Sequence, residues 1–393
     1  MIKRNLKEYA ITHFPDNPWL RKKATEWIIA DLQKYLITPD EVTNCELHPE
    51  LKAEVIQRQK NKWPKKYQTI ANFANKMLEN ISCYDGIEDK TPIFTDMVFC
   101  FFAYGFLPDE YVFFYLEGTN EEHRRSYVSE IDRLVFTFRV NDFAEKDLLV
   151  DKYVAYQMLH EFYGREAICI EFAKDYTQFC EFVNAHPVFV KKLVGEGRGK
   201  SIELIETRQE TDLRALFNKL IHDGRTILEE RINQAKELAV FNPSSVNTVR
   251  IVTMKTRDGI IIPYTFLKNG REGSFVDNGA LGGILIGIDP ATGILFSNGF
   301  DETGSEFQMH PDSGVTYIGY QLPDWESARQ LCMRAAKDIK GMQYISWDAA
   351  YTDKGWVIVE GNKAGQMVAQ QMTIQHGIKA ELEELLKKMD VIC

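Results

Sequence analysis

Two carboxylates and an amide near the end of the chain have the spacing of a metal-binding hairpin. Asp348 and Glu360 stand on two β-rich runs that the turn-forming residues Asp353-Lys354-Gly355 separate. Because side chains on a strand repeat every two residues, Glu360 and Asn362 share one strand face, and the turn brings Asp348 to the paired strand. Carboxylate and amide oxygens suit Mg²⁺ alongside substrate phosphates. The metal candidates are therefore Asp348, Glu360 and Asn362, although Glu-x-Asn alone is a common sequence.

A second group combines lysines with alternating glycines. The β-rich run that starts at Val188 delivers two lysines, and a loop with glycine at every second position follows. Alternating glycines let the backbone approach a polyphosphate and point its N–H groups at the oxygens. The spacing matches neither the P-loop nor the dinucleotide-binding fingerprint, and an ordinary glycine-rich hairpin explains the loop alone equally well. The phosphate-binding candidates of this segment are Lys191, Lys192, Gly195, Gly197, Arg198, Gly199 and Lys200.

A third and weaker signal is a short β-rich run that begins at Thr226 and ends in the paired carboxylates Glu229 and Glu230, just ahead of Ile232. Taken by itself, this pattern is more typical of a solvated strand end than of a binding site. It indicates a binding site only in combination with the lysine–glycine segment before it and the Asp348–Asn362 hairpin after it.

The elements that must position these residues change in type along the chain. Residues 1 to 130 have a mainly helical pattern, with apolar residues at three- and four-residue spacing in Trp19–Leu36 and Phe73–Ile81. The aromatic stretch Phe94–Leu116, with a turn at Gly105–Pro108, predicts a buried helix pair. No basic residue is interleaved with these rings, which disfavours base stacking. Composition places a boundary between residues 130 and 150.

Beyond this boundary the chain alternates between short β-rich runs and helical segments. Asp258-Gly259 is a hairpin signal between two such runs, and Gly224 marks a helix end. The predicted strands are Ala167–Phe172, Val188–Val194, Thr226–Arg231, Val249–Lys255, Ile260–Lys268 and Gly355–Glu360, and the predicted helices are Glu210–Ile221, Trp325–Ile339 and Ile378–Met389. This alternation predicts an α+β or mixed α/β body.

Composition excludes several classes of protein. The chain of 393 residues carries 47 Lys and Arg against 57 Asp and Glu, a formal charge of −10, which disfavours wrapping duplex nucleic acid. Seven cysteines without a Cys-x-x-Cys pair argue against a disulfide framework and a structural zinc site. The N-terminus lacks the apolar core of a signal peptide, and charges and Pro108 interrupt the most hydrophobic window, so we predict no membrane span. We expect a cytoplasmic enzyme.

Taken in order, the three groups resemble the ATP-grasp superfamily, which has a strand lysine with a glycine-rich lid, a Glu-bearing hinge strand and a closing Asp…Glu-x-Asn hairpin. Further segments are similar to the branch called sugar-transfer-associated ATP-grasp proteins, typically encoded among polysaccharide biosynthesis genes. The segments that carry this resemblance are Tyr104–Phe106, Asp151–Lys152, Pro243–Thr253, Arg271–Asn278, Gly282–Gly283, His310–Pro311, Pro323–Trp325 and Trp347–Asp348.

The resemblance implies an α+β ATP-grasp fold, in which two α+β subdomains sandwich ATP, preceded by a mainly helical N-terminal extension. It implies a helical region at 1–130, an N-terminal ATP-grasp subdomain with the glycine-rich lid at 131–225, and a C-terminal subdomain with the hinge and metal site at 226–393. ATP and Mg²⁺ are the cofactors that such a fold implies.

The resemblance also assigns roles at the nucleotide. Lys191 matches the strand lysine that contacts the phosphates, but Lys192 stands where many members carry proline, so which lysine points inward is open. The glycine-rich loop would cover the β- and γ-phosphates, and the ribose ligand is left open. Residues that match the adenine hinge are Glu229, Glu230 and Ile232, and those that match the magnesium ligands are Asp348, Glu360 and Asn362.

Each candidate near the substrates has a structural alternative. Arg250 would stabilise an acylphosphate intermediate or form a buried salt bridge, and Arg271 would bind a substrate carboxylate or lie on the surface. His310 would act as a base or cap its own loop, and the Asp-Asn pair at 277–278 would orient a substrate or form a turn. The substrate-binding candidates are Asn247, Asp277, Asn278 and His310.

The implied activity is that of an ATP-dependent carboxylate–amine ligase acting through an acylphosphate. It would join a sugar acid or related carboxylate to an amino acid or amine during surface polysaccharide assembly. Two alternatives stay open: a phosphotransferase whose acceptor keeps the phosphate, and a catalytically inactive nucleotide-binding scaffold. The expected partners are small-molecule carboxylate and amine substrates, with no nucleic acid, and a homodimer is left open.

Overall fold

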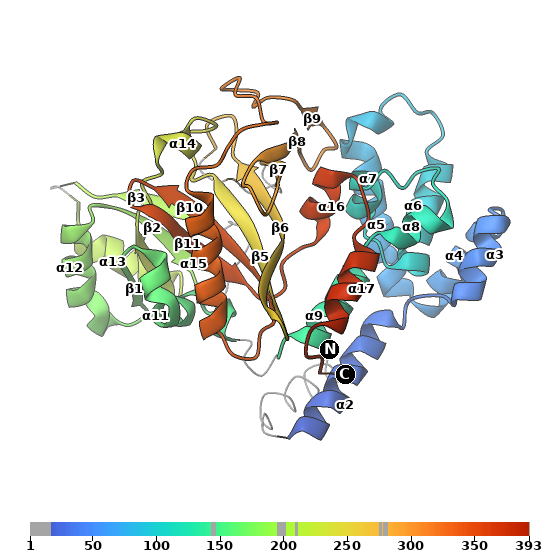
Figure 1. Ribbon diagram of the computed structural model, residues 1–393, viewed down its shortest axis with the longest axis horizontal. Helices are drawn as coiled ribbons and strands as arrows, with labels where there is room; N and C mark the ends of the chain where they lie inside the picture. Colours follow the sequence, from blue (N-terminus) through green and yellow to red (C-terminus); the bar gives the residue numbers. More distant parts are fainter. Residues whose placement is uncertain are drawn as a thin grey trace.

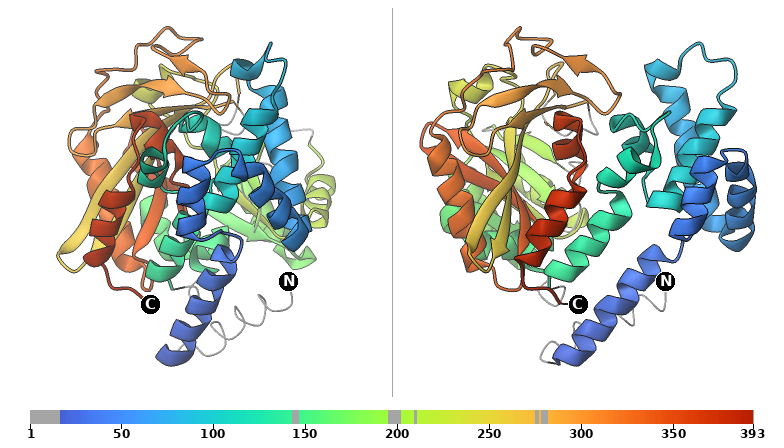
Figure 2. Two further views of the ribbon diagram at one scale, coloured as in Figure 1. Left: turned by 90° about the vertical axis from the view of Figure 1, so that its right-hand side faces the viewer. Right: turned by 45° about the vertical axis from the view of Figure 1, so that its right-hand side comes forward.

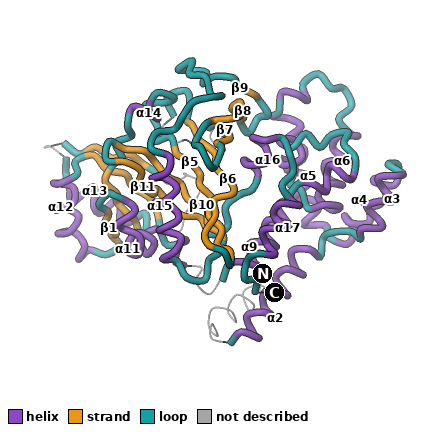
Figure 3. The backbone as a smooth tube through the Cα atoms, in the orientation of Figure 1, coloured by secondary structure: helices purple, strands orange, loops and turns teal. Residues whose placement is uncertain are grey.

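The computed structural model describes residues 17–142, 147–194, 202–208, 211–274, 277 and 282–392. Two antiparallel β-sheets form the body, and helices from the first third of the chain pack beside the larger sheet (Figure 1). Figure 3 separates helices from strands in the same view. The arrangement is the predicted α+β class with a mainly helical N-terminal region. Among the described residues, no helix is both long and apolar enough to cross a membrane.

The smaller sheet has four strands in the order β1-β4-β2-β3. Its strands are β1 (Ala167–Ile170), β2 (Val188–Leu193), β3 (Glu203–Glu206) and β4 (Thr226–Glu230), and helices α12 (Tyr176–Ala185) and α13 (Leu213–His222) cover one face. Phe189 and Leu228 point from the strands into the core that these helices share. Because neighbouring side chains alternate across a strand, Lys192 and Glu229 lie on the opposite face.

The larger sheet has seven strands in the order β11-β10-β5-β6-β7-β8-β9. Its strands are β5 (Thr248–Thr256), β6 (Gly259–Asn269), β7 (Ile284–Ile288), β8 (Leu295–Phe300), β9 (Glu306–Phe307), β10 (Tyr344–Thr352) and β11 (Gly355–Asn362). One face packs against α15 (Trp325–Asp338) and α11 (Lys152–Tyr163). The other face packs against α9 (Glu130–Val140), α16 (Val368–Ile374) and α17 (Lys379–Lys387).

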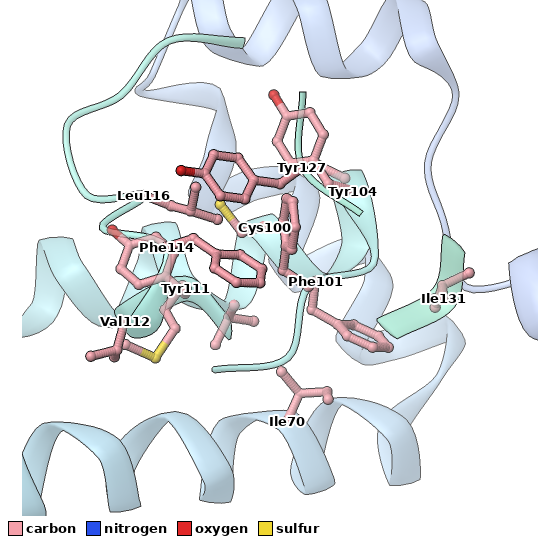
Figure 4. Packing of buried hydrophobic residues seen from close by; sticks show 14 of the residues in the cluster. Ile70, Cys100, Phe101, Tyr104, Tyr111, Val112, Phe114, Leu116, Tyr127 and Ile131 are labelled. Carbon is pink, nitrogen blue, oxygen red and sulfur yellow. The ribbon is translucent and has the colours of Figure 1, made fainter. Parts of the chain in front are cut away.

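The N-terminal helices pack around an aromatic core. They are α2 (Pro18–Gln33), α3 (Pro39–Leu47), α4 (Leu51–Lys62), α5 (Pro64–Asn80), α6 (Thr91–Tyr104), α7 (Pro108–Phe113) and α8 (Glu121–Ser126). Phe101, Tyr111 and Phe114 lie near its centre (Figure 4). This core continues into Phe266 and Leu285 of the large sheet. The helical region and the sheet therefore share one core, with α9, α16 and α17 between them (Figure 2).

Two local predictions are confirmed by their turns. Gly105 separates α6 from α7 at φ +87, where a Cβ would come within 2.7 Å of the Ile131 Cβ, so glycine is required in the predicted helix pair. Gly259 opens β6 at φ +136 in the predicted Asp258-Gly259 hairpin. Strands β3, β7, β8 and β9 were not predicted, and the domain boundaries at 130 and 225 stay predictions. The short elements are the 3₁₀ turns Ser82–Tyr84 and Ala173–Asp175, α10 (Asp147–Val150) and α14 (Lys236–Ala239).

Candidate functional site

A row of polar side chains crosses three neighbouring strands of the large sheet. Glu360 on β11 pairs directly with Asp348 on β10, and Asp348 pairs in turn with Arg250 on β5. The predicted hairpin pairing of Asp348 and Glu360 is thereby confirmed. The register shifts just after Asp348, so that Val359 is an extra residue in β11. A bulge of this kind bends the strand and re-aims the side chains next to it.

Asp348 is the most heavily paired carboxylate of this row. Its Oδ1 accepts from Arg250 Nε at 2.5 Å and lies 3.1 Å from Lys268 Nζ, while Oδ2 accepts from Arg250 Nη2 at 2.9 Å. Burial alone would raise the pKa of this carboxyl, but the two cations outweigh burial and hold the pKa well below its usual range. Lys268, which reaches Asp348 from β6, was not among the residues predicted from the sequence.

Glu360 and Asn362 are the two members of the predicted metal set that have fewer partners than Asp348. Asn362 Nδ2 donates to Glu360 Oε1 at 3.3 Å, so the two side chains share a strand face as predicted. No group of three His, Cys, Asp or Glu side chains in the described part of the chain could hold a metal ion. The set nevertheless fits Mg²⁺, which commonly binds through one or two carboxylates and completes its shell with water and substrate phosphates. Its role as a metal site stays a prediction.

The small sheet carries a second cluster around Glu229. The Oε2 atom of this buried carboxylate accepts from Arg165 Nε and from Lys192 Nζ, each at 2.9 Å. Burial would raise the pKa of Glu229, but the charges of Arg165 and Lys192 lower it to about 2. The predicted hinge residue therefore uses its side chain inside the protein, which leaves the backbone after β4 for any contact with adenine.

The two neighbouring lysines of β2 point to opposite faces of the small sheet. Lys191 Nζ lies 2.6 Å from Asp223 Oδ2, at the end of α13, and 3.2 Å from Glu203 Oε1 on β3. Lys192 instead shares Glu229 with Arg165. Because Arg165 also contacts the large sheet, Lys192 is the lysine whose face turns toward β11. This geometry favours Lys192 over Lys191 for a ligand held between the sheets.

Arg165, which was not predicted from the sequence, connects the two sheets. Its Nη1 donates to the Ile358 carbonyl at 2.7 Å and its Nη2 to the Val359 carbonyl at 2.9 Å, next to the bulge that precedes Glu360. The same guanidinium holds Glu229. A single buried side chain thus ties the cluster on the small sheet to the strand of the candidate metal site. The only local signal is the Gly164-Arg165 pair before β1, which does not indicate a partner 193 residues away.

Of the remaining residues predicted to bind the nucleotide, some lie in the described part of the chain and others lie outside it. Glu230 donates its backbone N–H to the Glu166 carbonyl at 2.8 Å, and its carboxylate accepts the Glu166 N–H at 3.1 Å. Ile232 is half-buried just after β4. The candidates that lie outside the described residues are Gly195, Gly197, Arg198, Gly199, Lys200 and Asn278.

Asn247 and His310, both fully buried, hold the same backbone residue. The Asn247 amide donates to the Leu238 and Asn242 carbonyls, each at 2.9 Å, and its Oδ1 accepts the Gly270 N–H at 3.3 Å. His310 Nε2 lies 2.9 Å from the Gly270 carbonyl, and Nδ1 accepts two N–H groups of its own loop. Both side chains therefore secure the residue that precedes Arg271.

Arg271 and Asp277 occupy the edge of this region. Arg271 Nη2 pairs with Asp301 Oδ2 at 2.9 Å, and the guanidinium lies over the Phe307 ring at 5.3 Å. Asp277 Oδ2 accepts both the N–H of Thr248, at 2.8 Å, and its hydroxyl, at 2.5 Å. Asp277 thereby anchors the start of β5, the strand that carries Arg250.

The two charge clusters have the same composition. Each joins two cations to one carboxylate: Arg165 and Lys192 with Glu229, and Arg250 and Lys268 with Asp348. Glu360, the next carboxylate in the row, forms no ion pair with a cation of the described residues, although its charge also helps to raise the pKa of Arg250. Buried charge of one sign attracts a counterion strongly, because the surrounding dielectric is low. The clusters therefore suit a polyanion together with a small divalent cation.

A comparison with known families assigns the chain to one of them. The model of the family described as sugar-transfer associated ATP-grasp matches residues 133–387, which is more than half of the sequence. The chain belongs to this family. ATP-grasp proteins are typically ATP-dependent ligases that use ATP and Mg²⁺, and the predicted ATP-grasp fold is confirmed.

Solved ATP-grasp structures resemble this ATP-grasp protein at low sequence identity. The ATP-grasp ligase PsnB, complexed with a phosphomimetic variant of its minimal precursor, Mg and ADP, matches with a TM-score of 0.39 and 13% identity over 63% of this chain and 61% of PsnB. D-alanine–D-alanine ligase from Bacillus anthracis complexed with ATP matches with a TM-score of 0.40 and 11% identity over 64% of this chain and 68% of the ligase. The sequence matches no curated protein.

Proposed function

We propose that this ATP-grasp protein is an ATP-dependent carboxylate–amine ligase that works through an acylphosphate. Its products would be ADP, phosphate and an amide between a sugar acid, or a related carboxylate, and an amino acid or amine, in surface polysaccharide biosynthesis. Family membership supports the reaction class, and the family's description supports the sugar-linked setting. The observation that carries the proposal is the pair of cation-rich clusters, one on each sheet, that Arg165 ties together at β11.

The cations have a defined task in this reaction. A carboxylate oxygen of the acceptor attacks the γ-phosphorus of ATP, the bond to the β–γ bridging oxygen breaks, and ADP leaves. Lys192 and Arg250 would neutralise charge on the phosphates in this step, and Arg250 would then hold the acylphosphate. An amine next attacks the acyl carbon, phosphate leaves, and the amine nitrogen gives up a proton to yield the amide.

The carboxylates of the large sheet would bind the metal ion and position Arg250. Glu360 and Asn362, together with Asp348, would hold Mg²⁺, which supplies charge neutralisation on the phosphate oxygens when bound. Glu360 suits this role because its carboxylate forms no ion pair with a cation of the described residues and acts on Arg250 only at longer range. Asp348 has the additional role of fixing the Arg250 guanidinium through two hydrogen bonds across the strands.

Arg271 is our candidate for the acceptor carboxylate. It follows Gly270, whose N–H and carbonyl are both held by buried side chains, Asn247 and His310. In this account these two predicted substrate residues are positioning residues, since their polar atoms bind backbone rather than project as free groups. Asp301 keeps the guanidinium in place until an acceptor carboxylate replaces or shares that contact.

The proposed function is tested by following ADP and phosphate release with MgATP across panels of sugar acids and amines, with mass spectrometry of any pair that raises turnover. We expect ADP and amide in equal amounts, and hydroxylamine in place of the amine should trap a hydroxamate from the same acid. A phosphorylated acceptor that accumulates and resists hydroxylamine would support phosphotransfer instead. Unchanged ADP release in Asn362→Ala and Arg250→Met would contradict the proposed site.

A further inference from the structure

A stretch of the N-terminal helices has a charge opposite to that of the whole chain. The chain carries a formal charge of −10, yet no Asp or Glu occurs between Glu54 and Glu79. The basic residues of this interval are Arg58, Lys60, Lys62, Lys65, Lys66 and Lys76. It covers most of α4 and α5 and the corner between them at Trp63.

Four of these lysines gather at that corner. Lys60 and Lys62 end α4, and Lys65 and Lys66 begin α5; the first three are exposed and Lys66 is half-buried. We call these four residues the basic corner. Unlike Arg58, which pairs with Glu41 at 2.5 Å, none of them has a carboxylate partner among the described residues. Within the part of the chain that the structure describes, the basic corner is therefore a positive surface without carboxylate partners on an acidic protein.

Three of the four ammonium groups of the corner lie over aromatic rings. Lys62 Nζ is 5.6 Å from the Trp63 ring, Lys60 Nζ is 5.1 Å from the Tyr67 ring, and Lys66 Nζ is 4.9 Å from the Tyr35 ring. Tyr35, just after α2, packs edge-on against Trp63 with the ring centroids 5.2 Å apart. The rings therefore hold these three ammonium groups at the corner instead of leaving the long side chains to move freely in solvent.

Helix stability alone does not account for this arrangement. Lysines in the last turn of α4 complement its negative end, which explains Lys60 and Lys62. Lys65 and Lys66 lie in the first turn of α5, where the positive end of the helix disfavours cations. Burial, and to a lesser extent the neighbouring charge of Lys34, lowers the pKa of Lys66, whose ammonium group also lies 5.2 Å from the Phe101 ring. A bound anionic surface would relieve this repulsion.

We propose that the basic corner docks the protein on a membrane surface rich in anionic lipid headgroups. Clustered lysines on the surface of a protein are attracted to such a surface, and Trp and Tyr side chains favour the membrane interface. A glycan partner would stack its sugar rings on open aromatic faces, but here ammonium groups occupy faces of all three rings. The corner joins two helices and presents separate point charges, which suits a broad array of headgroups. This inference does not depend on the proposed function.

The attraction to an anionic membrane should be weak for each single lysine and strong for the four lysines together. Each lysine near an anionic membrane contributes about fivefold to the partition coefficient, so four together contribute roughly 10²- to 10³-fold. Binding should fall steeply with added salt, because ions screen charges beyond about 10 Å at 0.1 M. Neutral phosphatidylcholine vesicles should retain little protein.

The test is co-sedimentation of the full chain with vesicles of phosphatidylcholine alone or mixed equally with phosphatidylglycerol. We expect binding to the anionic vesicles only, and a loss of roughly 10²- to 10³-fold when all four lysines of the corner become glutamine. The matched control replaces four exposed lysines elsewhere, Lys337, Lys340, Lys354 and Lys388, by glutamine and should keep most of the binding.

A second variant guards against misfolding. Lys65→Gln with Lys66→Gln relieves repulsion at the start of α5 and leaves the lysines over Trp63 and Tyr67 in place, so the fold should be kept or stabilised while binding falls about 25-fold. Three results would overturn the proposal: equal binding to both kinds of vesicle, equal losses in the control variant, or no vesicle binding alongside binding to a soluble acidic polysaccharide.

Discussion

The charge network of the helical region and the two charge clusters of the sheets have different ratios of cations to carboxylates. In the helical region, Arg124 and Lys52 share Asp96 and Glu46 through contacts of 2.6–3.1 Å, so two cations meet two carboxylates. The hydroxyls of two tyrosines, Tyr104 and Tyr111, donate to the same carboxylates. Between and on the sheets, by contrast, each cluster has two cations for one carboxylate.

We interpret this difference in charge ratio as the difference between a structural network and a site that binds a ligand. A balanced group satisfies its own charges and gains nothing from an additional ion. A buried excess of cations is unfavourable by itself, because the free-energy cost of removing two cations from water exceeds their electrostatic attraction to a single carboxylate. In our proposal the cation-rich clusters therefore take up an anion in the functional state, whereas the network around Arg124 joins four helices, α3, α4, α6 and α8, and keeps them in position.

The largest expected effect on stability comes from unbalancing the helical network. Asp96→Asn leaves two buried cations with one charged partner and should lower the free energy of unfolding by about 3–5 kcal/mol, measured by urea denaturation. Glu26→Gln, which breaks only the solvent-exposed pair with Lys23, is the control and should leave the free energy of unfolding close to that of wild type. A smaller effect for Asp96→Asn than for this control would contradict a structural network.

Arg250→Met should have the largest effect on activity. Loss of the guanidinium removes a donor to the phosphates or the acylphosphate, and ADP release should fall about 10²- to 10³-fold. The stability loss should be smaller than for Asp96→Asn, because Lys268 still pairs with Asp348. Arg257→Met, just beyond the end of the same strand, is the matched control. Equal losses of ADP release in the two variants would argue that Arg250 acts only on folding.

Arg165 tests the connection between the sheets. Arg165→Met removes two hydrogen bonds to β11 and one partner of Glu229, and should lower the free energy of unfolding by about 2–3 kcal/mol. Arg165→Lys keeps a charge for Glu229 but lacks the planar fork, so it should recover part of the nucleotide affinity and little of the stability. MgATP affinity equal to wild type in Arg165→Met would show that the connection does not position the site.

The smallest effect is a dependence on pH. The pKa of Glu229 is about 2 in the folded protein against 4.5 as its ordinary value, so its stabilising contribution is present above the ordinary value and is lost as pH falls toward 2. Urea denaturation at pH 5 and pH 3 should show a larger loss in wild type than in Glu229→Gln, by on the order of 1–2 kcal/mol. Equal losses would mean that Glu229 is not paired in solution.

Local patterns in the sequence predicted some of these features well. The pairing of Asp348 with Glu360 follows from the two-residue period of strands and the turn at Asp353–Gly355, and both are short-range properties. The buried pair α6–α7 follows from its aromatic run and from Gly105 in the same way. Where all the residues that define a structural feature lie within about 20 positions of one another, their spacing in the sequence was sufficient to predict the feature.

Features that depend on distant partners could not be predicted in this way. Arg165 contacts a strand 193 residues further on, and Lys268 reaches Asp348 from a separate strand. The choice between Lys191 and Lys192 depends on which face of β2 the helices α12 and α13 cover. The strand β7 lacks alternation because all five of its residues are buried, on both faces of the sheet.

The central claim is that a nucleotide lies between the sheets, against Lys192 and the row that ends in Glu360. Isothermal titration of MgATP into Lys192→Met and Lys191→Met tests it most directly, because the two lysines are adjacent in sequence and point to opposite faces. We predict that Lys192→Met weakens binding at least about tenfold, as loss of a charge-assisted contact should, whereas Lys191→Met stays within about twofold of wild type. Equal affinities in the two variants, or a loss confined to Lys191→Met, would contradict the account.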